Sequence, residues 1–484
     1  MTTTTMFALA MVGILLPFVT AFIIIITPRP AARWLCVIAA AIATLATLGV
    51  WLAFSQAGSD SVNVDLISWG GLVLMGFTFD KLTVMLSTCF VFIGFLITMY
   101  SFGYMSQRNR EHPDKPRRRF YAFFIIFIGA MAGLVYSSTV IGFLVFFEIT
   151  GACSWALIGY YATDKARHAA MKALIVTHIA ALGLYLAIGV LYVQTGSFEI
   201  SAIANLDMFW KGFVLICITV AAWGKSAQLP FYMWLPSAME APTPVSAYLH
   251  GASMVKIGVV IMARSLTAAG AIPDAVGWVL VIGAIATLIF SFLMYLPQRD
   301  MKRLLAFSTI SQLSYMFLGF AFYVFGSQLA FTGSVMHIFN HAFAKTLFFL
   351  IAGAFSCCVG TRLLPKLKGV LKKLPILGVG FAVAALAIAG VPPFNGFFSK
   401  TTIFVGAFSV AGGNWLLMLI VIVALIETVC AFAWFLKWIG SVLPGEPSEE
   451  VAAAEPVPKV MVVVFVVLII MTICSSFIAG AWLG

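Results

Sequence analysis

Charged residues are scarce in this sequence. Only 9% of its 484 residues are Asp, Glu, Lys or Arg, and 62% are hydrophobic. An ordinary soluble domain carries roughly 25% charged residues. The shortage of charge therefore excludes a soluble globular protein and predicts an integral membrane protein. The apolar runs leave too few residues between them to form a sizeable soluble domain.

Cysteine motifs are also missing. The eight cysteines show neither CxxC nor cluster-type spacing; they are Cys36, Cys89, Cys153, Cys217, Cys357, Cys358, Cys430 and Cys474. The sequence has no nickel, iron-sulfur, flavin or quinone signature either. We therefore expect no metal and no cofactor in this chain, and we assign it no redox site of its own.

The abundant feature is the long apolar run. A membrane-spanning helix needs about 20 mainly apolar residues, and the sequence supplies roughly fourteen such runs. The first run has neither a basic n-region nor a cleavage signature, so we expect it to remain as the first helix. The chain is predicted to be an all-α polytopic membrane protein. The predicted spans are 4–26, 33–54, 82–104, 120–137, 139–161, 170–194, 212–236, 243–265, 273–295, 303–325, 328–354, 376–407, 413–439 and 460–482.

The basic residues occupy alternate loops. One set of loops holds "QRNREHPDKPRRR" (107–119), "TDKARH" (163–168), "QRDMKR" (298–303) and "RLLPKLKGVLKK" (362–373), with Arg29, Arg33, Lys437 and Lys459. The positive-inside rule makes these loops cytoplasmic, and an even number of helices then puts both termini outside. The net charge of +11 thus indicates topology and lipid contact rather than nucleic-acid binding. Docking of a cytoplasmic partner remains the alternative.

Two of the predicted spans are interrupted by proline. Pro230 and Pro236 interrupt the seventh span, and "GVPPFNGFFSK" (390–400) interrupts the twelfth. Proline removes a backbone donor and breaks a helix. The two breaks are five spans apart, which predicts two inverted five-helix repeats. The expected units are an N-terminal three-helix segment (1–104), a first repeat with helices 4 to 8 (105–265), a second with helices 9 to 13 (266–440), and a linker with the last helix (441–484).

Several ionisable residues fall inside the predicted spans. A charge at the bilayer centre costs about 2.5–3.5 kcal/mol, and broken helices in matching positions of two repeats indicate an ion path. Spacing of i, i+4 and i+8 places three of these residues on one helix face, which predicts a proton wire. These three are His337, His341 and Lys345; the other candidates are Glu148, Lys225, His250, Lys256 and Lys400, with Glu427 and His178 as weaker ones.

Structural roles are the alternatives for these residues. A buried histidine such as His178 can serve packing, and Glu148 with Lys225 can hold two helices in register. Snorkelling to the interface is the alternative for the lysines at 256, 345 and 400. A carboxylate near a buried lysine keeps it protonated, and its withdrawal releases the proton. We therefore expect Glu148 to control Lys225, which would pass its proton toward Lys256 and the histidines. His250 and Lys256, six residues apart, are expected on different faces of one helix.

Long motifs in the sequence resemble a known family. "FFEITGACSWALIGYY", "GKSAQLPFYMWLPSAMEAPTPVSAYLHGASMVKIG", "NHAFAKTLFFLIAGA" and "GVPPFNGFFSK" resemble the antiporter-like subunits of respiratory complex I, Mrp-type antiporters and membrane-bound hydrogenases. Within that family, "NREHPDKPRRRFYAFFIIFIGAMAGLVYSS" and "GTRLLPKLKGVL" resemble the hydrogenase-4 component D group of formate hydrogenlyase-type complexes. The resemblance covers nearly the whole chain and implies fourteen helices with inverted repeats.

The resemblance also implies roles for individual positions. Glu148 matches the glutamate of the fifth helix and Lys225 the lysine of the seventh. The eighth-helix relay corresponds to residues 250 and 256, and the eleventh-helix relay to residues 337, 341 and 345. Lys400 matches the exit residue of the twelfth helix, which is lysine in some branches and glutamate in another. His178 stands where some relatives carry arginine, so no role is transferred to it.

Together these observations predict a proton-translocating subunit of a hydrogenase-4 or formate hydrogenlyase-like complex in a bacterial inner membrane. Other antiporter-like subunits and a cytoplasmic hydrogenase or redox arm would be its partners, and that arm would carry out the chemistry. A subunit of an Mrp-type Na+/H+ antiporter or of NADH-quinone oxidoreductase is the alternative, since the family shares its pumping motifs. A structural anchor that does not pump is the alternative from a different class.

Overall fold

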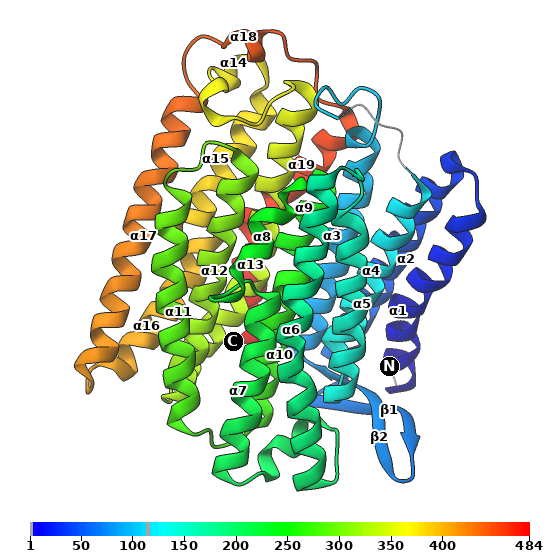
Figure 1. Ribbon diagram of the computed structural model, residues 1–484, viewed down its shortest axis with the longest axis vertical. Helices are drawn as coiled ribbons and strands as arrows, with labels where there is room; N and C mark the ends of the chain where they lie inside the picture. The colour runs from blue at the N-terminus through cyan, green and yellow to red at the C-terminus, as the bar shows by residue number, and fades with distance from the viewer. Residues whose placement is uncertain (1–2, 113–116) are drawn as a thin grey trace.

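The computed structural model describes residues 3–112 and 117–484, apart from the side chain of Arg29. The part of the predicted basic loop at 113–116 lies outside the described residues. The fold is nearly all helical, with most helices running along the long axis of the molecule (Figure 1). The chain therefore has the predicted all-α class.

The longer helices account for most of the chain. They are α1 (Thr3–Ile26), α2 (Arg29–Ala57), α3 (Lys81–Tyr104), α4 (Arg118–Tyr136), α5 (Val140–Ile158), α6 (Asp164–Thr195), α7 (Met208–Lys225), α9 (Thr243–Gly251), α10 (Met254–Ala268), α11 (Asp274–Tyr295), α12 (Met301–Val324), α13 (Gln328–Cys358), α15 (Pro375–Ala389), α16 (Asn395–Ala411), α17 (Trp415–Val442) and α19 (Lys459–Leu483). Short helices are α8 (Trp234–Ser237), α14 (Val370–Lys373) and α18 (Glu449–Ala452), and 3-10 turns are η1 (Ile200–Asn205), η2 (Phe231–Met233), η3 (Ala238–Glu240) and η4 (Leu364–Lys366).

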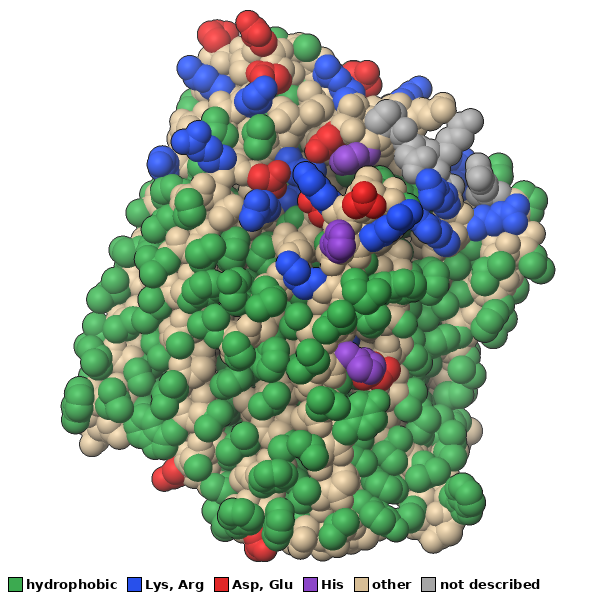
Figure 2. All heavy atoms as spheres, viewed as in Figure 1, with side chains coloured by type: hydrophobic (Ala, Val, Ile, Leu, Met, Phe, Trp, Pro, Cys, Tyr) green, Lys and Arg blue, Asp and Glu red, His purple; other side chains and the backbone are tan. Residues whose placement is uncertain are grey.

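Within the described residues, 13 helices are long and apolar enough to cross a membrane, with α9 and α10 counted as one. The broken pair α15 and α16 supplies the fourteenth crossing expected from the sequence. On the face shown in Figure 2, apolar side chains form a broad band, and Lys and Arg gather at one end. This pattern is that of a multi-pass membrane protein.

A β-hairpin lies at the end opposite the basic loops and was not predicted. Strands β1 (Ser61–Trp69) and β2 (Leu72–Asp80) pair antiparallel around Gly70 and Gly71. Both glycines have positive φ, a conformation that glycine adopts at little steric cost. The side chains of β1 alternate in burial, which is the pattern of a half-buried strand. Alternation flanking a Gly-Gly turn was the available sequence signal.

The two predicted breaks are present, and a third was missed. α7 ends at Lys225, and α15 ends at Ala389, followed by the cap residue Gly390, which has a φ of +86°. The chain from α7 runs away from the hairpin end, while the chain from α15 to α16 runs toward it (Figure 1). The seventh and twelfth crossings are thus inverted. The eighth crossing was predicted to be continuous over 243–265, but it is interrupted at Ala252 and Ser253.

Helix α13 lies at the centre of the bundle. It contacts α3, α9, α12, α15, α16 and α19, and its membrane-spanning stretch is fully buried in the protein. Its ionisable side chains are therefore shielded from lipid by neighbouring helices. Polar groups placed here interact with other protein groups rather than with the bilayer.

An ion-pair cluster at the basic end joins distant parts of the chain. Arg362 places Nη1 2.7 Å from Glu111 and Nε 2.8 Å from Asp300, and Ser356 donates to Glu111. Burial opposes the positive charge, but Asp300 and Glu111 outweigh burial and raise the pKa of Arg362 above its ordinary value. The cluster holds the loop after α3 against the loops around α12 and α13.

Loss of this cluster should destabilise the protein. We expect Arg362→Gln to lower the stability by about 2 kcal/mol, because two partly buried carboxylates lose their cation. The apparent midpoint of thermal unfolding in detergent measures the effect. Lys366→Gln is the matched control: its exposed pair with Glu450 spans 3.2 Å, and its loss should hardly change the midpoint. Equal shifts in both variants would contradict the structural role of Arg362.

Candidate functional site

The predicted row on α13 is present. His337, His341 and Lys345 are all buried and lie one helical turn apart along one face. The ring centroids of the two histidines are 6.0 Å apart. Each of the three side chains contacts a polar group on another helix. The row is therefore a line of titratable side chains through the bundle, each with a polar partner.

Lys256 meets the middle of this row. Its Nζ lies 2.8 Å from Nδ1 of His341. In an N–H···N hydrogen bond one nitrogen donates and the other accepts, so the pair shares a single proton between its facing atoms. Lys256 is completely buried, which excludes snorkelling within this chain. Helix α10 packs closely against α7 at Gly258, because any larger residue there would place its Cβ 2.1 Å from the carbonyl oxygen of Ala222.

The expectation that His250 and Lys256 share one helix was wrong. His250 belongs to α9 and Lys256 to α10, because the chain breaks between them. The Nδ1 atom of His250 lies 3.1 Å from Oγ1 of Thr309 on α12. The neighbouring Ser308 accepts a hydrogen bond of 2.9 Å from Nζ of Lys345. Two consecutive hydroxyls of α12 therefore lie between His250 and the end of the α13 row that is nearer to the basic loops.

His337 lies at the other end of the row and leads to the second broken helix. Its Nε2 is 3.1 Å from Oε1 of Gln312, and its Nδ1 is 2.9 Å from Oγ of Ser399. The Gln312 oxygen can only accept, so Nε2 carries the hydrogen and Nδ1 is left to accept from the serine hydroxyl. Ser399 directly precedes Lys400 on α16. The row therefore reaches the residue predicted to be the exit.

Lys400, Tyr315 and Glu427 form a compact group. Nζ of Lys400 donates to the carbonyl of Ile388 at 3.1 Å and lies 4.6 Å from the centroid of the Tyr315 ring. The Tyr315 hydroxyl donates to Glu427, which also accepts from Ser311 at 2.9 Å. Lys400 is buried, which excludes snorkelling here as well. The weaker candidate Glu427 thus lies at the end of the row, joined to Lys400 through a tyrosine.

Lys225 lies at the first break, but it is not paired with Glu148 as the sequence suggested. Its Nζ donates to the carbonyl of Phe147 at 3.0 Å and sits 4.2 Å from that ring's centroid. Glu148 instead places Oε2 2.9 Å from Nδ1 of His178 on α6. Among the described residues no ion pair joins Glu148 to Lys225, although Lys225 bonds to the residue that directly precedes Glu148. His178, to which no role was transferred, is the partner of that carboxylate.

Polar residues also extend from Lys225 toward α12. Ser226 donates to the carbonyl of Val255 at 2.9 Å, next to Lys256. The side chain of Gln228 donates to the Ser226 carbonyl at 3.0 Å, and Ser314 on α12 donates to Gln228 at 2.8 Å. These groups lie at backbone positions that the break in α7 frees from helical hydrogen bonding. They connect the region of Lys225 with that of Lys256 by polar side chains.

The hydroxyl and amide side chains of the site were not predicted from the sequence. Ser308, Thr309, Gln312 and Tyr315 all lie in the segment "AFSTISQLSYMF" of α12, and they recur on the face that meets α13 and α17. Their density within one predicted span was the signal that could have found them. In the part of the chain that the structure describes, no three His, Cys, Asp or Glu side chains are grouped as metal ligands would be.

Comparisons with known proteins agree with this architecture. Residues 137–427 match the family described as "NADH:quinone oxidoreductase/Mrp antiporter, TM", and residues 69–121 match "NADH-Ubiquinone oxidoreductase (complex I), chain 5 N-terminus". The chain is 36% identical over 396 residues to "Na(+)/H(+) antiporter subunit A1" of Staphylococcus aureus strains JH9 and Newman. These alignments cover 77% of this chain and 48% of each relative, so the chain spans about half the length of the curated relatives it matches.

Solved structures show the same fold. The Mrp complex from Dietzia sp. DQ12-45-1b superposes with a TM-score of 0.86 at 26% identity, over 98% of this chain and 51% of that chain. The membrane-bound sulfane sulfur reductase, an archaeal respiratory membrane complex, gives a TM-score of 0.85 at 22% identity, over 98% and 95%. The second likeness concerns the fold alone. Since the first family covers more than half of the residues, the chain belongs to the antiporter-like membrane subunits of the NADH:quinone oxidoreductase/Mrp antiporter family.

Proposed function

We propose that this chain translocates protons as one subunit of a multi-subunit membrane complex. The observation that carries the proposal is the bond of 2.8 Å between Lys256 and His341 in the buried interior. Both groups can hold a proton, and ionisable groups buried at membrane depth are costly and typically mark an ion or proton path. The α13 row continues from this pair to His337, which lies 2.9 Å from Ser399 of the second broken helix, and to Lys345, whose partner Ser308 adjoins the Thr309 that contacts His250.

The proposed path uses both halves of the chain. Residues 105–265 would supply the first repeat, in which Lys225 stores a proton beside the break after α7. Residues 266–440 would supply the second repeat, in which Lys400 and Glu427 release it. Histidines 337 and 341 would carry the proton between the two breaks. Moving one charge changes the proton affinity of the next group. A partner subunit that perturbs one end of the row would therefore set the direction in which protons move along it.

We further propose that this subunit belongs to a hydrogenase-4 or formate hydrogenlyase-like complex. The similarity of its loop and helix motifs to the component D group supports this proposal. Identity of 36% to an Na(+)/H(+) antiporter subunit favours the second candidate, an Mrp-type antiporter. In a hydrogenase-type complex, electron transfer in a cytoplasmic arm would drive protons along the row. In an Mrp-type antiporter, sodium ions would move in exchange for protons.

Purification of the tagged protein in mild detergent distinguishes these candidates. Mass spectrometry of the accompanying subunits, with nickel and iron assays, is the measurement. Hydrogenase-like subunits with both metals support the redox complex. Antiporter-like subunits alone, without either metal, support the Mrp-type assembly and overturn the redox proposal. Reconstituted complex that moves no protons under either driving force would favour the structural anchor instead.

The face around Glu148 is the proposed contact with a neighbouring subunit. Figure 2 shows a histidine beside an acidic side chain in the middle of the apolar band. The side chains of His178 and Glu148 are 56% and 27% exposed, and polar groups facing lipid at this depth are costly. A neighbouring antiporter-like subunit would cover this pair and bring its own charges beside the start of the row. Basic loops on the cytoplasmic side and both termini outside complete the proposed orientation.

Cross-linking can test this contact. We expect His178→Cys to cross-link to a neighbouring membrane subunit in the intact complex. The reagent is a short bifunctional thiol reagent, and the neighbouring subunit supplies a native or introduced cysteine that faces position 178. The background needs Cys474→Ser, since Cys474 is exposed. Ile282→Cys on α11, which is 60% exposed, is the matched control on another lipid-facing helix. A product with Ile282→Cys and none with His178→Cys would place the neighbour elsewhere.

A further inference from the structure

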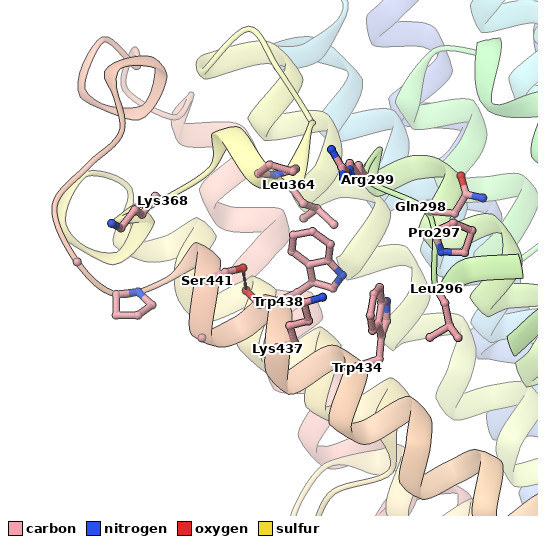
Figure 3. A pocket seen from close by; sticks show the side chains of 14 residues that line it. Leu296, Pro297, Gln298, Arg299, Leu364, Lys368, Trp434, Lys437, Trp438 and Ser441 are labelled. Carbon is pink, nitrogen blue, oxygen red and sulfur yellow. Dashed lines mark hydrogen bonds between the residues drawn. The ribbon is translucent and has the colours of Figure 1, made fainter. Parts of the chain in front are cut away.

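A groove of about 960 Å³ opens at the basic end of the molecule, away from the relay row. Figure 3 shows Trp434, Lys437 and Trp438 of α17 on one side and the segment Leu296–Arg299, which follows α11, on the other. The turn η4 and the chain after α17 close the remaining edge. The groove therefore lies where the apolar band meets the charged loops.

Two hydrogen-bond donors in this groove have no acceptor. The indole Nε1 atoms of Trp434 and Trp438 are both buried and make no hydrogen bond among the described residues. Trp438 as a whole is only 8% exposed. A buried donor without a partner costs about 1–3 kcal/mol. A tryptophan of the usual interfacial belt keeps its N–H toward water or headgroups, so these buried indoles need another source of acceptor oxygens.

Three cations surround the same space. Arg299, Lys368 and Lys437 line the groove and are exposed, and no ion pair involves them among the described residues. Nζ of Lys437 lies 4.4 Å from the centroid of the Trp434 ring. No carboxylate lines the groove. The nearby cations at 362, 366 and 372, by contrast, are all paired with acidic side chains.

Apolar surface continues from the groove toward the middle of the membrane. Leu293 on α11 is 58% exposed, and Leu436 on α17 is 41% exposed. The two helices contact one another. A ligand with an anionic head and a long apolar body matches this sequence of surfaces, because its head meets donors and cations while its tail follows the aliphatic side chains.

We propose that this groove binds the headgroup of an anionic phospholipid from the leaflet at the basic end. The phosphodiester oxygens accept from the indole N–H groups of Trp434 and Trp438. Lys437, Arg299 and Lys368 balance the negative charge, and the acyl chains lie along α11 and α17. The bound lipid would rest against α17 two to three turns from Glu427, and Tyr295, which donates to Glu427 at 3.3 Å, directly precedes the groove residue Leu296.

Native mass spectrometry of the full-length protein, purified with its accompanying subunits, tests the proposal. Delipidated complex is titrated with phosphatidylglycerol or with the zwitterionic phosphatidylcholine. We expect tighter binding of phosphatidylglycerol. Trp438→Phe keeps the ring but removes the donor, and should weaken this binding about tenfold, since hydrogen bonds to charged groups contribute about 1.5–3 kcal/mol. Lys437→Gln should weaken it about fivefold, because a cation near the membrane surface contributes about 1 kcal/mol.

Matched controls lie outside the groove. Trp415→Phe changes an exposed tryptophan at the other end of α17, and Arg303→Gln removes an exposed cation at the same end of the molecule. Neither should alter phosphatidylglycerol binding. If Trp438→Phe fails to fold, Lys437→Gln still decides, because that side chain is exposed.

Four results would overturn the proposal. The first is equal binding of both lipids, and the second is a loss in the control variants as large as in the groove variants. The third is displacement of phosphatidylglycerol from the groove by inorganic phosphate alone, which would show a site for free phosphate. The fourth is cross-linking of Lys437→Cys to a partner subunit in complex that binds no lipid, which would show a protein-binding surface.

Discussion

Lys225→Ala is expected to abolish proton translocation while leaving the complex assembled. Lys225 is buried beside the first helix break, and its ammonium group donates to the carbonyl of Phe147. Alanine cannot hold a proton, and no other ionisable side chain of α7 lies near this break. A positioned proton carrier typically contributes 10²–10⁴-fold to a transfer step, so we expect the rate to fall about a hundredfold or more.

Proteoliposomes that contain the purified complex and a pH-sensitive dye provide the measurement, and size-exclusion chromatography reports assembly. Lys211→Ala is the matched control, since Lys211 is a second buried lysine of α7 that donates to the carbonyl of Ala271 at 3.1 Å, outside the row. It should transport at nearly the normal rate. Full transport by Lys225→Ala would remove Lys225 from the path, and equal loss in both variants would indicate a general effect of deleting a buried lysine.

The sequence was most informative where the site lies within one helix. Spacing alone placed His337, His341 and Lys345 on one face, because helical periodicity does not depend on the neighbouring helices. The breaks after Lys225 and at Gly390 were also predictable, since proline leaves a direct signal. The break between His250 and Lys256 has no proline at the interruption, so it could not be read in the same way.

Contacts between helices were less predictable. Lys225 bonds to the carbonyl of Phe147, next to Glu148, but the ion-pair partner of Glu148 is His178 on α6, which was not predicted. Which carboxylate meets which cation depends on how helices rotate against each other, and residue spacing within a helix says nothing about this rotation. Ser399 and Gln312 were missed for a related reason. Serine and glutamine occur throughout the sequence, and only their contacts with His337 distinguish these two from the others.

Substitution of either member of the Lys256 and His341 pair should stop translocation nearly completely. Lys256→Met keeps an unbranched side chain but removes the proton carrier, and His341→Phe keeps a planar ring but removes both nitrogens. Each variant should lose transport about a hundredfold or more. The same proteoliposome assay measures the rates, and Thr267→Val on α10 serves as the control because its hydroxyl bonds only within its own helix, at 3.1 Å.

The double variant Lys256→Met with His341→Phe tests whether the two residues act in one path. Facing nitrogens 2.8 Å apart share one proton, so in the proposed path each proton passes through both groups in series. Removing the second member of a step that is already blocked changes nothing, and we expect the double variant to transport no more slowly than the slower single variant. Independent residues would instead multiply their effects. Multiplied losses would therefore show that Lys256 and His341 act independently of each other. Two parallel routes would instead give a small loss in each single variant and a large loss only in the double variant.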